Sequence, residues 1–152
     1  MKKLLPALCL SLAVLSVARA EERATPEDAK DLVKTAVAYL KKHGTEKAFK
    51  EFQNKNGPFV YKDLYVFVNS LEGKTLVHAV DPGRVGMDVS QAKDADGKLY
   101  VQERIAIAKA QGSGWQEYKY RNPVTNKIEP KVSYFERVDD FIIVAGAYKN
   151  PK

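Results

Sequence analysis

The spacing of hydrophobic residues changes twice along the chain, and each change marks a new kind of element. Residues 4–17 form an almost unbroken apolar run. Between residues 29 and 40, apolar side chains recur every three or four positions, which is the spacing of one face of an α-helix. After Pro58, apolar residues alternate with polar ones and β-branched residues become common, as in strands. The pattern predicts an N-terminal leader, then helices, then a sheet.

Two helices are expected before the sheet. Thr25 is a favourable N-cap, Pro26 suits the first helical position, and basic residues followed by Gly44 suit a helix end. Thr45 is then expected to cap a second, shorter helix, which the polar segment 54–58 ends. The apolar face of this second helix consists of Ala48, Phe49 and Phe52.

Five strands and a third helix account for the remainder. The expected strands are residues 63–69, 75–80, 115–121, 132–138 and 141–148. Segment 81–97 has no sustained period and is expected to be a loop that covers another part of the fold. A helix over about residues 99–110 follows, with Leu99, Ile105 and Ile107 to bury. The fold class is therefore α+β, with two N-terminal helices and a five-stranded antiparallel sheet that has a helix inserted between strands 2 and 3.

The N-terminal run has the features of a secretory signal peptide. Two lysines precede it, and residues 18–20 supply small side chains at the place of a cleavage site. The run is shorter than the roughly 20 apolar residues of a membrane span. Cys9 raises the alternative of a lipoprotein, but Leu8 stands where a lipoprotein signal has a small residue. We expect a cleaved signal peptide at residues 1–20 and one exported, periplasmic domain at residues 21–152.

Composition excludes several classes of function. The single cysteine lies in the leader, so residues 21–152 offer no disulfide, thiolate nucleophile or cysteine metal site. Three of the 25 Lys and Arg residues also lie in the leader, and the other 22 are interspersed with 19 Asp and Glu residues. Nucleic-acid binders gather their basic residues on one face, so nucleic acid is not an expected partner. No serine has the surroundings of a nucleophile elbow, and adjacent acids such as Asp139 and Asp140 are typical of solvated turns, so the chain is not expected to be an enzyme.

Residues 92–103 carry part of a calcium-binding pattern. The residues that match places of an EF-hand loop are Asp94, Asp96, Gly97, Leu99 and Glu103. The first place is Ala92, which lacks the carboxylate of a primary ligand. The two histidines of the chain are far apart in sequence, so neither a zinc nor a haem site is indicated. We expect no metal and no cofactor, and calcium binding by this segment stays an open alternative.

Short motifs recur in a particular order through residues 63–148. They are 63–69 followed by Glu72-Gly73, Leu76-Val77-His78-Ala79 before Gly86-Met87-Asp88, Asp96-Gly97-Lys98, Gly114-Trp115 before Tyr118, Lys131-Val132-Ser133-Tyr134, and the closing 141–148. Their order and spacing resemble those of the single Cache domains, the extracellular PAS-like sensor modules of bacterial chemoreceptors and sensor kinases. The chain departs from that pattern at Ala79, where many such domains have proline, and at Phe141, where the last strand commonly opens with tryptophan. Such domains usually lie between transmembrane helices, so this chain looks like a free-standing periplasmic form.

The resemblance implies a small-molecule site on the sheet face beneath the loop that follows the second strand. The residues at matching positions are Tyr65, Phe67, His78, Tyr118, Tyr120, Lys131, Ser133 and Tyr134. Side chains alternate along a strand, so Asn69 shares a face with Tyr65 and Phe67. By the same rule, Trp115 and Tyr118 point to opposite faces.

The cation that would meet an anionic ligand has three candidates. Lys131 is the first choice, because an ammonium supplies three donors and a full charge. Arg84 and Arg104 are alternative anchors with bidentate geometry. Each has a simpler interpretation, with Lys131 as a solvated edge lysine and the arginines as exposed charges. His78 can likewise be a packed strand residue, and some tyrosine rings belong to the core.

The resemblance predicts a periplasmic sensor of a small molecule, such as a short organic acid or similar metabolite. Its expected partners are an anionic ligand and a membrane sensor kinase or chemoreceptor, with the first helix as the surface of a possible homodimer. The alternative is a ligand-free interaction subunit of a membrane kinase, receptor or transporter.

Overall fold

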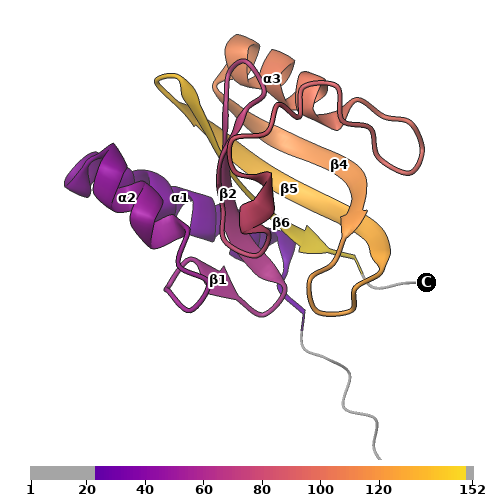
Figure 1. Cartoon of the computed structure of the whole chain (residues 1–152), viewed down its shortest axis with the longest axis horizontal. Coiled ribbons are helices and arrows are strands. Elements are labelled where there is room, and N and C mark those ends of the chain that lie inside the picture. The colour runs from indigo at the N-terminus through magenta and orange to yellow at the C-terminus, as the bar shows by residue number, and fades with distance from the viewer. Residues whose placement is uncertain (1–22, 150–152) are drawn as a thin grey trace, which may run out of the picture.

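The computed structural model of the chain describes residues 23–149 (Figure 1). Its helices are α1 (Pro26–His43), α2 (Thr45–Phe52) and α3 (Tyr100–Gln111), with a 3-10 turn η1 (Pro82–Arg84). Its strands are β1 (Val60–Tyr61), β2 (Leu64–Ser70), β3 (Thr75–His78), β4 (Ser113–Arg121), β5 (Ile128–Val138) and β6 (Phe141–Tyr148). The expected signal peptide lies outside the described residues. Within those residues, no helix combines the length and the apolar character that crossing a bilayer requires.

The strands form one antiparallel sheet in the order β1-β2-β6-β5-β4, and β3 pairs with β2. The α+β class is confirmed, with the third helix inserted between β3 and β4 as expected. The sixth strand, β1, was not predicted because two residues are too short to show alternation. β5 begins four residues earlier than expected, at Ile128, since the pairing of Lys119 with Pro130 extends the β4–β5 hairpin.

Helices cover both faces of this sheet (Figure 1). α1 and α2 pack on one face, against the core that includes Val66, Val68 and Ile143. α3 packs on the other face, against the core that includes Phe67, Phe135 and Val144. Alternation along each strand divides its side chains between these two layers. The two faces are called the α1 face and the α3 face below.

The first helix forms as its sequence predicts. Thr25 Oγ1 accepts a hydrogen bond from the Asp28 amide at 3.1 Å, and the Asp28 carboxylate accepts one from the Thr25 amide at 2.8 Å. This capping box satisfies two of the amides that a helix start leaves open. The expected cap of the second helix is wrong, because Gly44, rather than Thr45, is its N-cap. The Gly44 amide closes α1 and the Gly44 carbonyl opens α2, so Thr45 already lies inside the helix.

α3 buries more side chains than were expected. Ile105 and Ile107 are partly buried and pack against the core, as expected, and Leu99 is also only partly buried. The fully buried side chains are those of Tyr100, Val101, Arg104 and Ala108. The prediction was incomplete because the sheet under α3 presents polar and aromatic side chains, so the helix turns a tyrosine and an arginine toward it.

Candidate functional site

Seven of the eight predicted site residues lie on the α3 face. Tyr65 and Phe67 extend from β2, and His78 lies opposite Phe67 on β3. Tyr118 and Tyr120 extend from β4, and Lys131 lies opposite Tyr118 on β5. Ser133 also belongs to this layer, because its Oγ lies 3.2 Å from the Tyr118 hydroxyl. Ser133 lies deep in the core and has no exposed surface. The pleat therefore gathers residues from four strands onto one face.

Tyr134 is not brought to this site. Its ring belongs to the core beneath α1, lies 5.0 Å from the Trp115 ring, and its hydroxyl donates to the Glu136 carboxylate at 2.9 Å. Ser133 and Tyr134 are consecutive, so the strand turns them to opposite faces. The prediction that Tyr134 lines the same pocket as Ser133 was wrong for this reason. The expected opposition of Trp115 and Tyr118 is confirmed by the same register.

Two connected spaces open above the site. An outer cleft of about 580 Å³ lies between the β3–α3 segment, β4 and the β4–β5 connection. An inner cavity of about 20 Å³ lies deeper, between β2, β3 and α3. The residues that line both are Tyr65, His78, Arg84, Tyr100 and Tyr120. These five side chains therefore lie where the outer cleft and the small inner cavity adjoin.

Arg104 of α3 is the cation that lines the inner cavity. Its side chain is 1% exposed, and its Nη1 donates to Asn69 Oδ1 at 2.8 Å. Its Nε and Nη2 have no hydrogen-bond partner within residues 23–149. These two N–H groups form one edge of the guanidinium, whose spacing matches the two oxygens of a carboxylate. The interpretation of Arg104 as an exposed charge is wrong.

Aromatic rings, rather than acids, surround the Arg104 guanidinium. Its central carbon lies 5.1 Å from the ring centre of Phe67, 5.4 Å from that of Tyr118 and 5.7 Å from that of Tyr100. Within the described residues, no carboxylate forms an ion pair with it. Cation–π contacts offset part of the lost hydration, but a free donor edge stays buried. The site therefore holds a positive charge that lacks an anion.

Lys131 is buried behind Tyr65 and is not a solvated edge lysine. Its Nζ donates to the Tyr65 hydroxyl at 3.0 Å and lies 4.2 Å from the centre of the same ring. The rings of Phe67, Tyr120 and Tyr148 complete its surroundings. Burial, together with the charge of Arg104, holds the pKa of the Lys131 amine well below its usual range. Lys131 therefore does not line the cavity itself but hydrogen-bonds to the hydroxyl of Tyr65, which does.

His78 is a neutral hydrogen-bonding group in this site. Burial and the nearby charges of Lys131 and Arg84 lower the pKa of its imidazole to about 3. Its Nδ1 accepts from the Asp81 amide at 3.1 Å, so Nε2 carries the hydrogen and can donate. Its backbone N–H and carbonyl both pair with the Gln53 side chain, each at 2.9 Å. The interpretation as a packed strand residue is thus compatible with a donor role.

Three tyrosine rings, one from α3 and two from β4, contact one another beside the cavity. Tyr100 and Tyr118 are stacked with 4.6 Å between their ring centres, and Tyr120 meets both edge-on. Tyr100 was missed from the sequence because Leu99, Ile105 and Ile107 were taken as the buried residues of this helix. Its spacing of four residues from Arg104 was the available signal, since such residues share a helix face.

The segment between β3 and α3 covers the site, as expected for a loop over another part of the fold. Asp94 fastens it to β4, because its Oδ2 accepts from the Lys119 amide at 3.0 Å. Its Oδ1 accepts from the amides of Asp96 and Lys98, both at 2.9 Å. Glu103, the twelfth place of the calcium pattern, pairs with Lys98 at 2.8 Å. Within residues 23–149, no three acidic or histidine side chains come together as a metal site.

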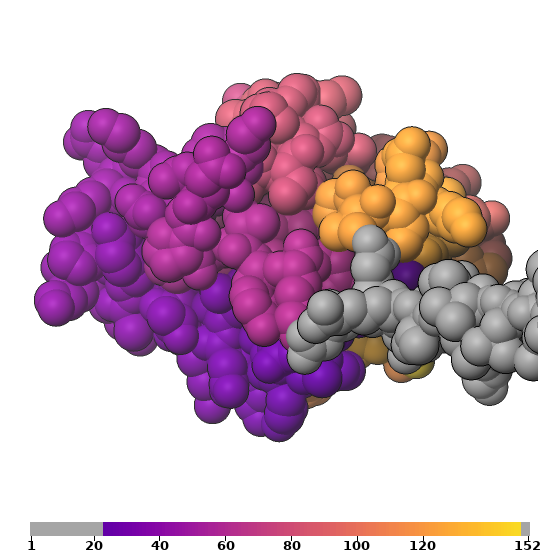
Figure 2. Space-filling model, turned by 90° about the horizontal axis from the view of Figure 1, so that it is seen from below, coloured from indigo at the N-terminus to yellow at the C-terminus, as the bar shows by residue number. Residues whose placement is uncertain are grey.

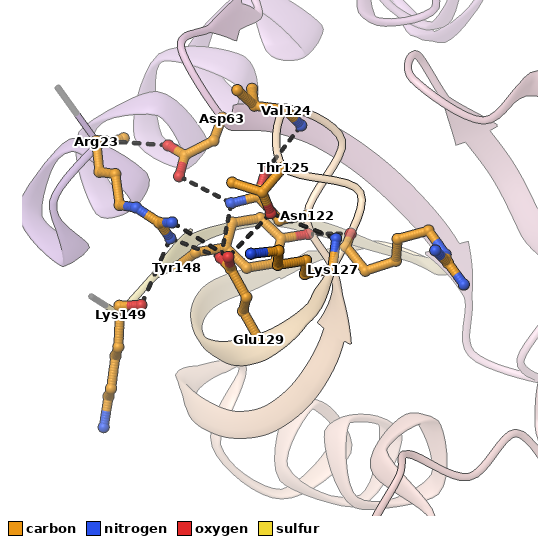
Figure 3. A network of polar contacts seen from close by, with 11 residues as sticks. Arg23, Asp63, Asn122, Val124, Thr125, Lys127, Glu129, Tyr148 and Lys149 are labelled. Carbon is orange, nitrogen blue, oxygen red and sulfur yellow. Dashed lines mark hydrogen bonds and ion pairs between the residues drawn. The ribbon is translucent and has the colours of Figure 1, made fainter. Parts of the chain in front are cut away.

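A polar network lies at the base of the domain, where the start of α1 meets the β4–β5 connection (Figure 3). Glu129 accepts hydrogen bonds from Arg23 at 2.6 and 3.1 Å, from Asn122 at 2.9 Å and from Thr125 at 2.9 Å. Asp63 accepts the Ala24 amide at 3.0 Å. Figure 2 shows this underside, where the indigo, magenta and orange segments meet. The network holds the connection whose Pro123 and Asn126 line the outer cleft.

Comparison with known proteins identifies the class of this domain. The family model described as single Cache domain 2 matches residues 10–150. A stretch of 85 residues is 36% identical to the sensor histidine kinase MctS of Rhizobium johnstonii, covering 56% of this chain but 18% of that kinase. The chain thus spans less than a fifth of this relative.

Two solved structures share the fold. The periplasmic sensor domain of a chemotaxis protein has 25% identity and a TM-score of 0.64, covering 82% of this chain and 90% of that one. A Cache chemosensory domain, described in connection with carboxylic acid recognition, has 23% identity and a TM-score of 0.64, covering 82% and 88%. The expected PAS-like architecture is confirmed by these matches.

Proposed function

Because the chain belongs to the single Cache domain 2 family, we propose that it is a sensor domain that binds a small carboxylate between β2, β4 and α3. The observation that carries this proposal is the buried, unpartnered edge of Arg104. A charge removed from water without a partner is strongly unfavourable. A carboxylate on Nε and Nη2 supplies both the missing hydrogen bonds and the missing charge.

The neighbouring side chains suit the rest of such a ligand. The rings of Phe67 and Tyr100, which line the inner cavity, offer apolar surface to a short carbon skeleton. Tyr65 and His78 supply hydrogen-bonding groups at the boundary of the cavity. Lys131 holds the Tyr65 hydroxyl in place, and Ser133 holds that of Tyr118.

Binding requires a change of shape. The inner cavity of about 20 Å³ has room for about one water molecule, so a carboxylate must displace the side chains or the covering segment. Ligand binding then favours a conformation in which the segment between β3 and α3 has moved. This dependence on conformation is how the domain reports that its site is occupied.

The signalling context follows from the family. We place the protein in the periplasm, exported by its N-terminal leader, with a membrane sensor kinase or chemoreceptor as its partner and no catalytic activity of its own. The face of α1 that points away from the sheet carries Lys34, Lys41 and Lys42, so a homodimer through this helix rests on polar contacts. The ligand-free interaction subunit is the alternative that a silent ligand screen would favour.

The proposal is tested by thermal unfolding of the purified protein with acetate, propionate, pyruvate, lactate and succinate, each at a large excess. Saturation at a hundred times Kd stabilises a protein by about 2.7 kcal/mol, so Tm rises for at least one acid. The amide of that acid, which lacks the charge, leaves Tm unchanged. Arg104→Gln abolishes the rise, whereas the exposed control Arg137→Gln retains it. An unchanged Tm with every acid contradicts the proposal.

A further inference from the structure

The inner cavity is lined by two arginines and by no acidic side chain of the described residues. The arginines are Arg84, at the end of η1, and Arg104, on α3. His78 lines the cavity as a neutral imidazole, as described above. Lys131 does not line this cavity, and burial lowers the pKa of its amine. The fixed charge around this space is therefore that of two guanidinium groups.

Arg84 lies where the two spaces join. It lines both the cavity and the outer cleft, and its guanidinium carbon lies 5.7 Å from the centre of the Tyr120 ring. The centre of the Tyr120 ring lies 6.2 Å from the centre of the Tyr100 ring. The guanidinium carbon of Arg104 lies over the same Tyr100 ring, at 5.7 Å from its centre. The two guanidinium groups thus flank one pair of contacting rings, with Arg84 on the side of the cleft.

Arg84 differs from the other cations that line the cleft. Its side chain is partly buried, yet it has no polar partner among the described residues. Within residues 23–149, it makes no hydrogen bond or ion pair, even with Asp81, which lines the same cleft. The other arginine and one of the lysines are engaged, because Arg121 donates to Asn126 and Lys119 pairs with Asp96. Lys93 also lines the cleft but is exposed to solvent.

We propose that the ligand is a short dicarboxylate, with one carboxylate on the free edge of Arg104 and the other on Arg84. This inference rests on the proposed function, and it extends it by giving the ligand a second anionic end. One carboxylate neutralises one of the two guanidinium groups, and the second charge needs its own anion. The cleft of about 580 Å³ falls within the usual range of ligand sites, and it has room for the distal half of such a molecule.

The test compares acids of matched length by isothermal titration calorimetry of the purified protein. Propionate is paired with malonate, butyrate with succinate, and valerate with glutarate. In at least one pair the dicarboxylate binds more tightly by about tenfold or more, which corresponds to ~1.4 kcal/mol. Arg84→Gln removes this preference, because it weakens binding of the dicarboxylate more than binding of the monocarboxylate, which pairs only with Arg104. Arg104→Gln weakens both members of each pair.

The outcomes separate the two proposals. Equal or tighter binding of the monocarboxylates, or a dicarboxylate preference that persists in Arg84→Gln, overturns the dicarboxylate assignment and leaves carboxylate sensing intact. Failure of every acid to bind overturns both. The control Arg137→Gln, whose side chain is exposed on β5, retains the behaviour of the unaltered protein. Circular dichroism of each variant shows that a lost preference is not lost folding.

Discussion

The two faces of the sheet bury different kinds of side chain. On the α1 face, the buried cluster is almost entirely apolar, and its rings interlock, as where Phe52 and Phe59 meet edge-to-face at 4.6 Å. On the α3 face, Arg104 and Lys131 are buried among tyrosines, and Arg104 keeps two N–H groups without partners. The first arrangement is favourable for stability, and the second is unfavourable in the absence of a ligand. The difference supports the proposal that the ligand site lies on the α3 face, and it does so without reference to any relative.

The largest expected effect comes from removing a ring from each face. Phe52→Ala on the α1 face is expected to lower the free energy of unfolding by about 3–5 kcal/mol, because it leaves a cavity among fully buried neighbours. Phe67→Ala on the α3 face is expected to lower it by less, because water that enters beside Phe67 hydrates Arg104 and Lys131. Urea unfolding monitored by circular dichroism measures both. Equal losses, or a greater loss for Phe67→Ala, would show that the two faces are packed alike.

Removing the buried charge is expected to have the opposite sign. Arg104→Met replaces an incompletely bonded guanidinium by an apolar side chain of similar length, and such replacements often stabilise a protein by about 1–4 kcal/mol. The unliganded variant should therefore unfold at a higher urea concentration than the unaltered protein, while binding no carboxylate. Arg137→Met, at an exposed position, should change stability by no more than about 0.5 kcal/mol. A destabilised Arg104→Met that still binds the acids contradicts this account of the α3 face.

The Glu129 network tests the contrast between paired and unpaired polar groups. The hydrogen bonds from Arg23, and then those from Asn122 and Thr125, lower the pKa of the Glu129 carboxyl to about 2 from the ordinary 4.5. The pKa of Glu129 is lower in the folded state than in the unfolded state, so its ionised form stabilises the fold. This contribution to the free energy of unfolding is fully present above pH 4.5 and is lost as the pH falls toward 2. Glu129→Gln should therefore lower stability at pH 7 by about 1–3 kcal/mol.

The same variant should flatten the dependence of stability on pH. Stability measured from pH 7 to pH 2.5 is expected to fall less steeply in Glu129→Gln than in the unaltered protein, since one carboxyl with a lowered pKa has gone. Glu117→Gln is the matched control, because Glu117 is exposed and its one ionic partner among the described residues is the exposed Lys149. Parallel curves of stability against pH for Glu129→Gln and the unaltered protein would show that the network does not lower the pKa of Glu129.

Most of the fold was predictable from the sequence because it follows from local patterns. The cap at Thr25, the stripe of α1 and the alternation of β2 and β6 each depend on neighbouring residues. The two-residue β1 carries too little pattern to be seen. The cap of α2 was assigned one residue late, because Gly44 closes one helix and opens the next through its backbone.

The site was predictable only in part, because burial of a charge is a tertiary property. The alternation rule placed Tyr65, Phe67 and Tyr118 correctly, and the same rule, applied to Ser133 and Tyr134, would have excluded Tyr134. Arg104 was an alternative anchor for which an exposed charge was the favoured interpretation, because arginine is mostly exposed. Nothing beside it in the sequence indicates that Asn69 and three rings enclose it. The Glu129 network joins residues up to 106 positions apart, a separation at which no local pattern acts.

The central claim is that the free edge of Arg104 receives a carboxylate, and the most direct measurement is the ¹⁵N–¹H NMR signal of Arg104 Nε, assigned by its loss in Arg104→Lys. On titration with an acid that raises Tm, this signal should shift downfield and exchange more slowly with water, because a charge-assisted hydrogen bond forms at that proton. The Nε signal of Arg137 should stay in place. An acid that binds while the Arg104 signal keeps its position and exchange rate would contradict the account.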